Sequence, residues 1–170
     1  MPYEKLLKKA LDLLSKRNYT VLRLKEKLFE FYKKQIEKNK LPEATKSEQN
    51  KEIKKVLTRL KELRYLNDTE YAKIFIGNRI EFRPKGKYML KRELKNKGIH
   101  PDLAERVVEG AEIDELENAK KALNKKAKAW QSSPPRKQKE KALRFLASRG
   151  FNFDAIYKAI DSWYNKAEVE

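Results

Sequence analysis

Glu93-Leu94-Lys95-Asn96-Lys97-Gly98-Ile99 recurs, with changes, as Phe145-Leu146-Ala147-Ser148-Arg149-Gly150-Phe151, 52 residues further along the chain. In both copies a leucine stands four residues before a glycine, a cation directly precedes the glycine, and a large apolar residue follows it. A glycine one position past a helix adopts the left-handed conformation that ends the helix, and the apolar residue packs on the turn. Each copy therefore predicts the end of one helix before the start of another, and the repetition predicts a repeat architecture.

A third and weaker copy lies near the N-terminus. Residues 24–28 align with residues 90–94, but the separation is 66 residues instead of 52, and Tyr32 stands where the glycine is expected. A polar insertion of about 14 residues within 33–52 restores the period. Because this run contains Pro42 and has low hydrophobicity, we predict a mobile loop or a frayed helix extension there.

Apolar residues recur at helical spacing along almost the whole chain, and no alternating stretch predicts a sheet. The pattern gives about nine helices in three groups of three. We therefore predict an all-α protein of three tandem three-helix repeats, spanning residues 1–65, 66–112 and 113–170 as one continuous structural unit. Three helices alone bury little apolar surface, so the repeats are expected to stack into an elongated, curved, right-handed array.

The composition limits the class of protein. The chain has 170 residues and no cysteine, which excludes disulfides, thiol nucleophiles and thiolate metal sites. No apolar run approaches the ~20 residues that span a bilayer, and no signal peptide opens the chain. We therefore expect a soluble, cytoplasmic protein without membrane contact.

The charge indicates the kind of partner. Forty-two basic and 25 acidic side chains give a net charge of +17, which indicates a polyanionic partner or a strongly acidic protein surface. Seven basic residues and one acidic residue lie between Arg83 and Lys97, and six and one lie between Arg136 and Arg149. These two segments are the middle helices of the second and third repeats, so the excess charge falls on equivalent elements.

Each of these helices carries a stripe of cations at helical spacing: Lys87, Lys91 and Lys95 on the first, and Lys137, Lys141 and Arg144 on the second. Solvated helix faces are the alternative, but solubility alone does not predict two stripes on equivalent helices. Tyr88 and Trp130 lie near the stripes and either stack on bases or pack in the core. The residues predicted to contact the polyanion are Lys85, Lys87, Lys91, Arg92, Lys95, Lys97, Arg136, Lys137, Lys141, Arg144 and Arg149.

Catalytic interpretations have little support. His100 is the only histidine, and its place before Pro101-Asp102 fits the start of a helix better than a general base. The segment 84–87 lacks the first glycine, the spacing and the hydroxyl residue of a phosphate-binding loop. The carboxylates within 109–117 favour the start of the next helix and include no histidine. We expect no catalytic residue, no metal and no cofactor.

Several of these motifs, taken in order, resemble the RecX family of bacterial recombination regulators. The resemblance is strong over the second repeat and the middle of the third, and weaker over residues 1–60. Two departures stand out, because Arg64 occupies a position that is usually glycine and the run 33–52 is long. The matching residues are Tyr65-Leu66-Asn67-Asp68, Tyr71-Ala72, Arg79, Lys85-Gly86, Glu93-Leu94, Lys97-Gly98-Ile99 and the whole of Phe145–Phe151.

The resemblance implies a non-enzymatic modulator of the RecA recombinase that acts in homologous recombination, DNA repair and the SOS response. Such a protein lies in the helical groove of the RecA–DNA filament and restrains its growth, and with it strand exchange, ATP hydrolysis and co-protease activity. The implied partners of this monomer are the RecA filament and single- or double-stranded DNA. The alternative is a helical protein that binds DNA directly, without dependence on RecA.

The resemblance also assigns structural roles within the repeats. Gly98 and Gly150 are helix stops and Asp68 is a helix cap; Gly86, which matches the family motif, is predicted from the sequence pattern to break the preceding helix together with Pro84. The remaining motif residues belong to the core, and they are Leu94, Phe145, Leu146 and Phe151.

Overall fold

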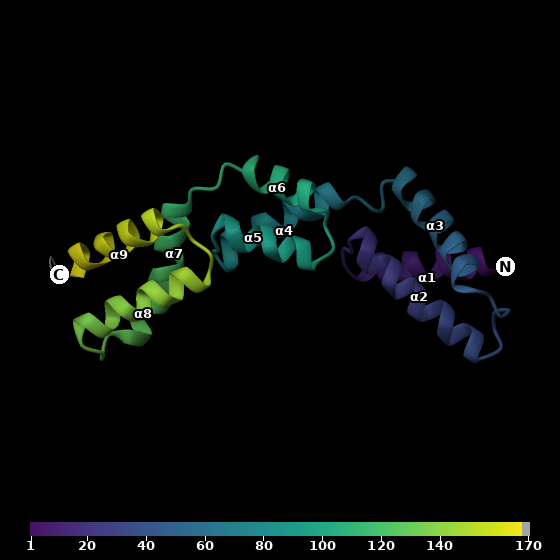
Figure 1. The fold of residues 1–170 in the computed structure, drawn as a ribbon, viewed down its shortest axis with the longest axis horizontal. Coiled ribbons are helices and arrows are strands. Elements are labelled where there is room, and N and C mark those ends of the chain that lie inside the picture. Colours follow the sequence, from purple (N-terminus) through teal and green to yellow (C-terminus); the bar gives the residue numbers. More distant parts are fainter. Residues whose placement is uncertain (168–170) are drawn as a thin grey trace. The chain divides into compact units, whose positions relative to one another are not determined.

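The computed structural model describes residues 1–167, and over that range it is entirely helical, with nine α-helices, one short 3₁₀ helix (η1) and no strand (Figure 1). The predicted all-α class and the tandem three-helix organisation are confirmed. The predicted repeat boundaries, at residues 65/66 and 112/113, stay a prediction. The elements are α1 (Pro2–Lys16), α2 (Val21–Glu37), α3 (Lys46–Glu62), α4 (Asp68–Phe82), α5 (Lys87–Asn96), α6 (Pro101–Glu109), α7 (Glu115–Ala127), η1 (Lys128–Trp130), α8 (Pro135–Ser148) and α9 (Phe153–Ala167).

The chain forms two compact units. Unit 1 consists of Met1–Tyr71 together with the short segment Lys97–Ile99, and unit 2 contains Ala72–Asn96 and the chain from His100 onward. Unit 1 holds α1, α2, α3 and the first turn of α4. Unit 2 holds the rest of α4, then α5 and α6, followed by the three-helix group of α7, α8 and α9.

The core of unit 1 is made by the apolar stripes of its helices. Leu6 of α1, Leu24 and Leu28 of α2, and Ile53 and Leu60 of α3 are completely buried in it. Each of these residues lies on the one apolar face of its helix, as helical spacing requires. Burial of a leucine or isoleucine side chain contributes about 1.5–3 kcal/mol, so this cluster carries much of the stability of unit 1.

The polar run 33–52 is mostly helical, so of the two predicted alternatives the structure agrees with a helix extension and not with a loop across the whole run. Helix α2 continues to Glu37 and α3 begins at Lys46, so only residues 38–45 connect the two helices. Leu41, within that connection, is 7% exposed and packs on the core of unit 1. Thr45 caps α3, because its hydroxyl accepts from the backbone N–H of Glu48 while the Glu48 carboxylate accepts from that of Thr45. A few anchors of this kind order a segment whose average hydrophobicity is low.

Unit 2 contains buried residues from both of its helical groups. Leu90 and Leu94 of α5 are completely buried, as predicted for Leu94. In the last group Leu146 is also completely buried and Phe151 is 6% exposed, while Phe145 is partly buried against the same core. The predicted core roles of all four motif residues are therefore confirmed.

The two predicted glycine stops are confirmed by their backbone angles. Gly98 has φ = 86° and Gly150 has φ = 74°, in the left-handed region that favours glycine. At the second stop, the N–H of Gly150 bonds the carbonyl of Ala147 at 2.9 Å and that of Phe151 bonds the carbonyl of Leu146 at 3.4 Å. These two bonds satisfy the last carbonyls of α8, and the ring of Phe151 enters the core beside Leu146.

Asp68 caps a helix, but not the helix that follows it. The cap of α4 is Asn67, whose side-chain oxygen accepts from the backbone N–H groups of Thr69 and Glu70 at 2.9 and 3.2 Å. The Asp68 carboxylate instead accepts from the backbone N–H of Val21, at the first position of α2, at 2.8 Å. Asp68 therefore caps a helix 47 residues away in the sequence. Burial raises the pKa of this carboxyl, although the bond from Val21 opposes the rise.

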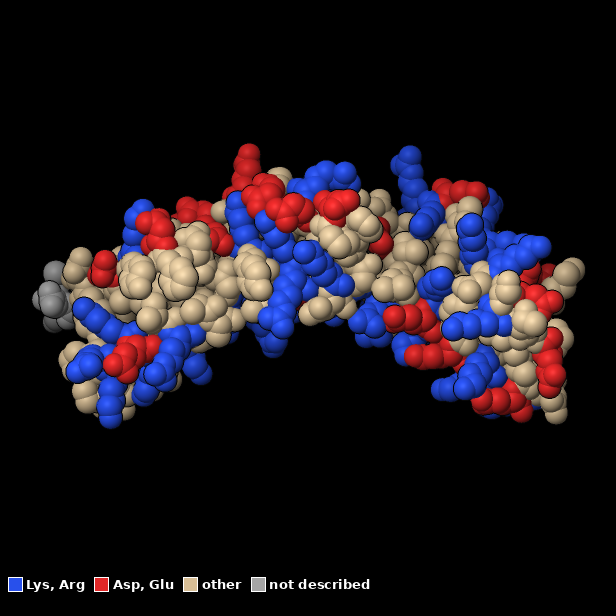
Figure 2. Space-filling model, viewed as in Figure 1, with Lys and Arg blue, Asp and Glu red and all other residues tan. Residues whose placement is uncertain are grey.

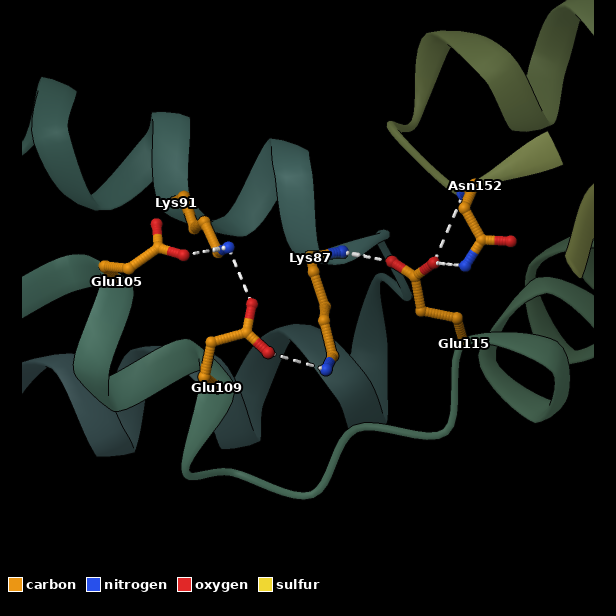
Figure 3. A network of polar contacts seen from close by, with 6 residues as sticks. All are labelled: Lys87, Lys91, Glu105, Glu109, Glu115 and Asn152. Atoms are coloured by element: carbon orange, nitrogen blue, oxygen red, sulfur yellow. Dashed lines mark hydrogen bonds and ion pairs between the residues drawn. The ribbon is translucent and has the colours of Figure 1, made fainter. Parts of the chain in front are cut away.

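Glu115 occupies the corresponding position at the start of α7 and makes the corresponding bond within unit 2. Its carboxylate accepts from the backbone N–H of Lys87, at the first position of α5, at 2.6 Å (Figure 3). The other carboxylate oxygen accepts from the backbone and side-chain nitrogens of Asn152, the residue before α9. One carboxylate thus satisfies donors at the beginnings of two helices, which are favourable places for negative charge.

Among residues 1–167, no helix combines the length and the apolar character needed to cross a membrane.

Candidate polyanion-binding surface

The cations predicted on α5 lie opposite carboxylates of α6. The Lys91 side-chain nitrogen is 2.6 Å from carboxylate oxygens of both Glu105 and Glu109, and that of Lys87 is 3.0 Å from Glu109 (Figure 3). Hydrogen bonds to Glu105 and Glu109 raise the pKa of Lys91, and the bonds from Lys91 and Lys87 lower the pKa of Glu109. Of this stripe, only Lys95 is exposed without an ion pair in the part of the chain that the structure describes.

Two further predicted contact residues near α5 have structural partners. Lys85 and Arg79 both bind the Glu93 carboxylate, and the Arg79 Nε atom lies 2.9 Å from it. Burial disfavours the charged carboxylate, but the bonds from Lys85 and Arg79 outweigh it and hold the pKa of Glu93 below its ordinary value. The backbone carbonyl of Lys97 accepts from the Thr20 hydroxyl at 2.6 Å within unit 1, while its side chain is exposed. The side chain of Arg92 is also exposed.

The stripe on α8 is different, because almost no acid accompanies it. Lys137, Lys141 and Arg144 are exposed, and none of them forms an ion pair with any residue from 1 to 167. The Lys141 side chain donates to the Ser133 hydroxyl at 2.8 Å. The one carboxylate on this helix, Glu140, is 3.6 Å from Arg136. Figure 2 shows the resulting cluster of blue side chains over α8.

Arg149 is a half-buried structural residue. Its guanidinium donates to the carbonyl of Pro84 at 3.2 Å and lies over the ring of Phe145, 4.6 Å from the ring centre. Burial, and to a smaller extent the nearby charge of Arg83, lower its pKa. The structure therefore separates Arg149 from the exposed cations of the same helix, with which the sequence had grouped it.

A second set of cations was missed. Five lysines and no acidic residue lie between Lys120 and Lys128, on α7 and η1. Lys120 is paired with Glu117, and Lys125 donates to the last carbonyls of α4, those of Glu81 and Phe82. The other members are exposed, and they are Lys121, Lys126 and Lys128. The excess of basic residues in this segment is the sequence feature from which these cations could have been identified.

We call a set of seven charged side chains on α7, η1 and α8 the basic hairpin. Helices α7 and α8 pack against each other and are joined through η1 and residues 131–134, so these side chains lie on neighbouring elements. With one carboxylate among seven charged groups, this set has a larger excess of positive charge than the neutralised face of α5. Its members are Lys126, Lys128, Arg136, Lys137, Glu140, Lys141 and Arg144.

The two aromatic candidates differ in their environment. Trp130 packs in the core, edge-on to Phe145, with ring centres 5.6 Å apart. Tyr88, on α5, is 67% exposed. Only Tyr88 is therefore accessible for stacking on a partner.

Two of the residues considered for chemistry make contacts at the beginnings of helices. The His100 Nδ1 atom accepts from the backbone N–H of Asp102 at 3.3 Å, so this histidine starts α6, as its position predicted. Asp114 caps α7 through the N–H of Glu117 at 3.0 Å. No group of three or more histidine, aspartate or glutamate side chains within residues 1–167 is arranged to hold a metal ion.

Comparison with known proteins gives a consistent family. Residues 67–108 match the model of the second three-helix domain of RecX, and residues 112–160 match that of the third. The chain is 30% identical over 119 residues to the regulatory protein RecX of Bacillus pumilus, covering 69% of this chain and 45% of that protein. It is 32% identical over 126 residues to the regulatory protein RecX of Chlorobium phaeobacteroides, covering 74% of this chain and 77% of that one.

A solved structure has the same fold. The crystal structure of RecX from Lactobacillus salivarius superposes with a TM-score of 0.73 at 21% identity, covering 95% of this chain and 96% of that chain. At this identity the likeness concerns the fold alone. The chain spans about half the length of the curated relatives from Bacillus pumilus and Leuconostoc mesenteroides, 45% and 52% respectively.

Proposed function

The chain belongs to the RecX family, and on that premise we propose that it regulates RecA-mediated recombination and DNA repair by binding the RecA–DNA filament. Bound there, it restrains filament assembly and the activities that depend on the filament. It acts in the cytoplasm as a monomer and performs no catalysis. The family supplies the partner in this proposal, and the charge of the protein supplies the means of contact.

The basic hairpin is the observation that carries the proposal. A RecA–DNA filament presents phosphates and protein carboxylates, and cations without neutralising neighbours are suited to both. Lys137, Lys141 and Arg144 have this property, since α8 carries one carboxylate and it lies beside Arg136. We therefore place the principal contact on the basic hairpin.

The face of α5 has a smaller part in the proposed contact. Lys87 and Lys91 already bind Glu105 and Glu109, so a partner phosphate would have to compete with two carboxylates. Lys95 and Arg92 remain available there. These two cations extend the contact surface without carrying it.

Direct DNA binding without RecA is the second candidate, and the same cations favour it. A DNA backbone needs only a basic surface, and such binding is largely independent of sequence. The two candidate functions predict different relative affinities for naked and RecA-coated DNA strands.

The deciding experiment measures affinity for single-stranded DNA, naked and coated with RecA, over a series of salt concentrations. The regulator predicts tighter binding to the coated strand and less RecA in the sedimented filament fraction when the protein is present. Equal affinity for both forms, with unchanged sedimentation of RecA, would reject the regulator and favour the direct DNA-binding protein.

A further inference from the structure

Unit 1 contains a groove of about 640 Å³ between α2 and α3. Its lining residues have no part in the proposed contact with the filament. Four lysines line it, Lys25 from α2 and three from α3, which are Lys51, Lys54 and Lys61. Ser47 and Thr58 add hydroxyl groups from the same face of α3. No carboxylate of residues 1–167 takes part in the lining. The charged side chains in the described lining of this groove are therefore all lysines.

The two faces of α3 show that this charge is not a general property of the helix. Away from the groove, Lys55 is paired with Glu52, and Arg59 is paired with Glu62 at 3.2 Å. On the groove face, no ion pair with a described residue involves Lys51, Lys54 or Lys61. The three groove lysines of α3 are thus outside its ion pairs, although the charge of Lys61 acts on the Asp68 carboxyl and opposes the rise of its pKa.

Like charges held around a concave surface repel one another, and an anion between them relieves that repulsion. The geometry sets the size of such an anion. At 1.5 Å of rise per residue, the ten residues from Lys51 to Lys61 cover about 15 Å along the axis of α3. A single phosphate is shorter than this distance, so a ligand that engages all three lysines carries several linked phosphate groups.

The chemistry of the lining selects phosphate. Lysine is a compact charge with three donors, and together with hydroxyl groups it is a common phosphate ligand. No aromatic side chain among the described residues lines the groove, so it offers nothing on which a base could stack. Recognition would therefore concern the phosphates and not the bases.

We propose that the groove between α2 and α3 is a binding site for linked phosphate groups. It lies outside residues 67–108 and 112–160, which match the family models, and it does not depend on the proposed regulation of RecA. The phosphates belong either to a free oligophosphate or to a nucleic-acid strand, and both present the same anionic oxygens to the lysines.

The test uses two variants with the same loss of charge. The groove variant replaces Lys51, Lys54 and Lys61 by glutamine, and the control variant replaces Lys8, Lys33 and Lys38, which are exposed and lie outside the groove. Glutamine has nearly the helix propensity of lysine, so both variants should fold, as circular dichroism would verify. Isothermal titration calorimetry then measures the affinity of each for inorganic tripolyphosphate and for an oligothymidylate, at several salt concentrations.

The groove variant should lose at least tenfold in affinity for tripolyphosphate relative to the control variant. If the loss appears only with the oligothymidylate, the site holds a nucleic-acid strand and the proposal stands with that source. Equal affinities of the groove and control variants for both ligands would overturn it, because the lysines would then act only through net charge. The RecA sedimentation assay is read separately, so failure of this site leaves the proposed function to be judged by itself.

Discussion

Gly86 lies directly against the backbone of Gly150, so closely that a Cβ atom on Gly86 would overlap the Gly150 carbonyl oxygen. The N–H of Gly86 donates to the carbonyl of Arg149 at 3.0 Å at the same place. This contact joins the beginning of α5 to the end of α8 within unit 2. Because both partners are backbone atoms, neither can move aside as a flexible side chain would.

Replacing Gly86 by alanine should therefore destabilise unit 2 by about 1–3 kcal/mol, the usual cost of forcing an extra methyl group into a packed site. Gly77 provides the matched control. It lies in α4, is exposed, and has no neighbouring atom within 4 Å of the place that a Cβ atom would take, so Gly77→Ala should stabilise the protein by up to about 1 kcal/mol. Urea denaturation measures both changes, and a neutral Gly86→Ala would show that the two backbones can separate freely.

Arg64 has a backbone conformation that favours glycine. It has φ = 60°, its N–H bonds the carbonyl of Lys61 at 3.0 Å, and the next N–H bonds that of Leu60 at 2.9 Å. This is the same helix ending as at Gly150, made here by an arginine in a conformation that favours glycine.

Arg64→Gly should raise the free energy of unfolding by up to about 1 kcal/mol, because removing the strain outweighs the added freedom of the unfolded chain. Arg64→Ala removes the same side chain and keeps the Cβ atom, so it should give no comparable gain. Thermal denaturation of the two variants makes the comparison. An equal gain in both would mean that the arginine side chain, and not its backbone angle, is unfavourable.

Local features of this chain could be predicted from sequence, and long-range ones could not. Gly98 and Gly150 follow from residues within one helical turn, and both have the predicted backbone angle. The bond from Val21 to Asp68 joins residues 47 apart, so Asp68 was assigned to its own helix. Nothing in the local sequence distinguishes an aspartate that caps its own helix from one that caps another.

Part of the candidate surface could likewise be predicted from local sequence, and part of it depends on long-range packing. The α8 stripe could be predicted because α8 carries one carboxylate, so the composition of the helix already indicates that most of its cations have no partner on the same helix. The α5 stripe looked equivalent, but its neutralisation by Glu105 and Glu109 depends on how α6 packs on α5. Lys126 and Lys128 could have been found by counting charge outside the repeated motif.

The Glu93 cluster should make stability depend on pH in the acid range. The pKa of Glu93 is lowered in the folded protein, because the bonds from Lys85 and Arg79 outweigh burial. A lowered folded pKa gives stability that is present above the unfolded value, about 4.5, and is lost as the pH falls through the folded value. Below about pH 4.5, the free energy of unfolding of the wild type should therefore exceed that of Glu93→Gln by less than it does at neutral pH.

Urea denaturation at pH 7, 5, 4 and 3 checks this dependence. The difference between wild type and Glu93→Gln should be constant from pH 7 to pH 5 and should shrink below that. Glu62→Gln serves as a control, because Glu62 is exposed and its partner among residues 1–167 is Arg59, and exposed pairs contribute about 0–1 kcal/mol. A difference for Glu93→Gln that does not change with pH would rule out the charged carboxylate as its cause.

The last prediction separates the two cation stripes. One variant replaces Lys137, Lys141 and Arg144 of α8 by glutamine, and the other replaces Lys87, Lys91 and Lys95 of α5. For every phosphate that the variant no longer binds, the dependence of log affinity on log salt should flatten by about 0.7–0.9. For binding to the RecA filament, the slope of log affinity against log salt should therefore become shallower by about two units in the α8 variant. In the α5 variant it should become shallower by about one unit or less.

The sequence by itself predicts that both variants respond, and the ion pairs of α5 are the reason to expect unequal responses. Lys87 and Lys91 bind Glu109 in the free protein, so replacing them exposes a carboxylate while removing little of the interaction with the filament. The α5 variant should instead show its effect as a small loss of stability, which urea denaturation detects. If both variants reduce the salt dependence of affinity equally, α6 releases these lysines when the filament binds. If the α8 variant does not reduce it, the basic hairpin is not part of the interface.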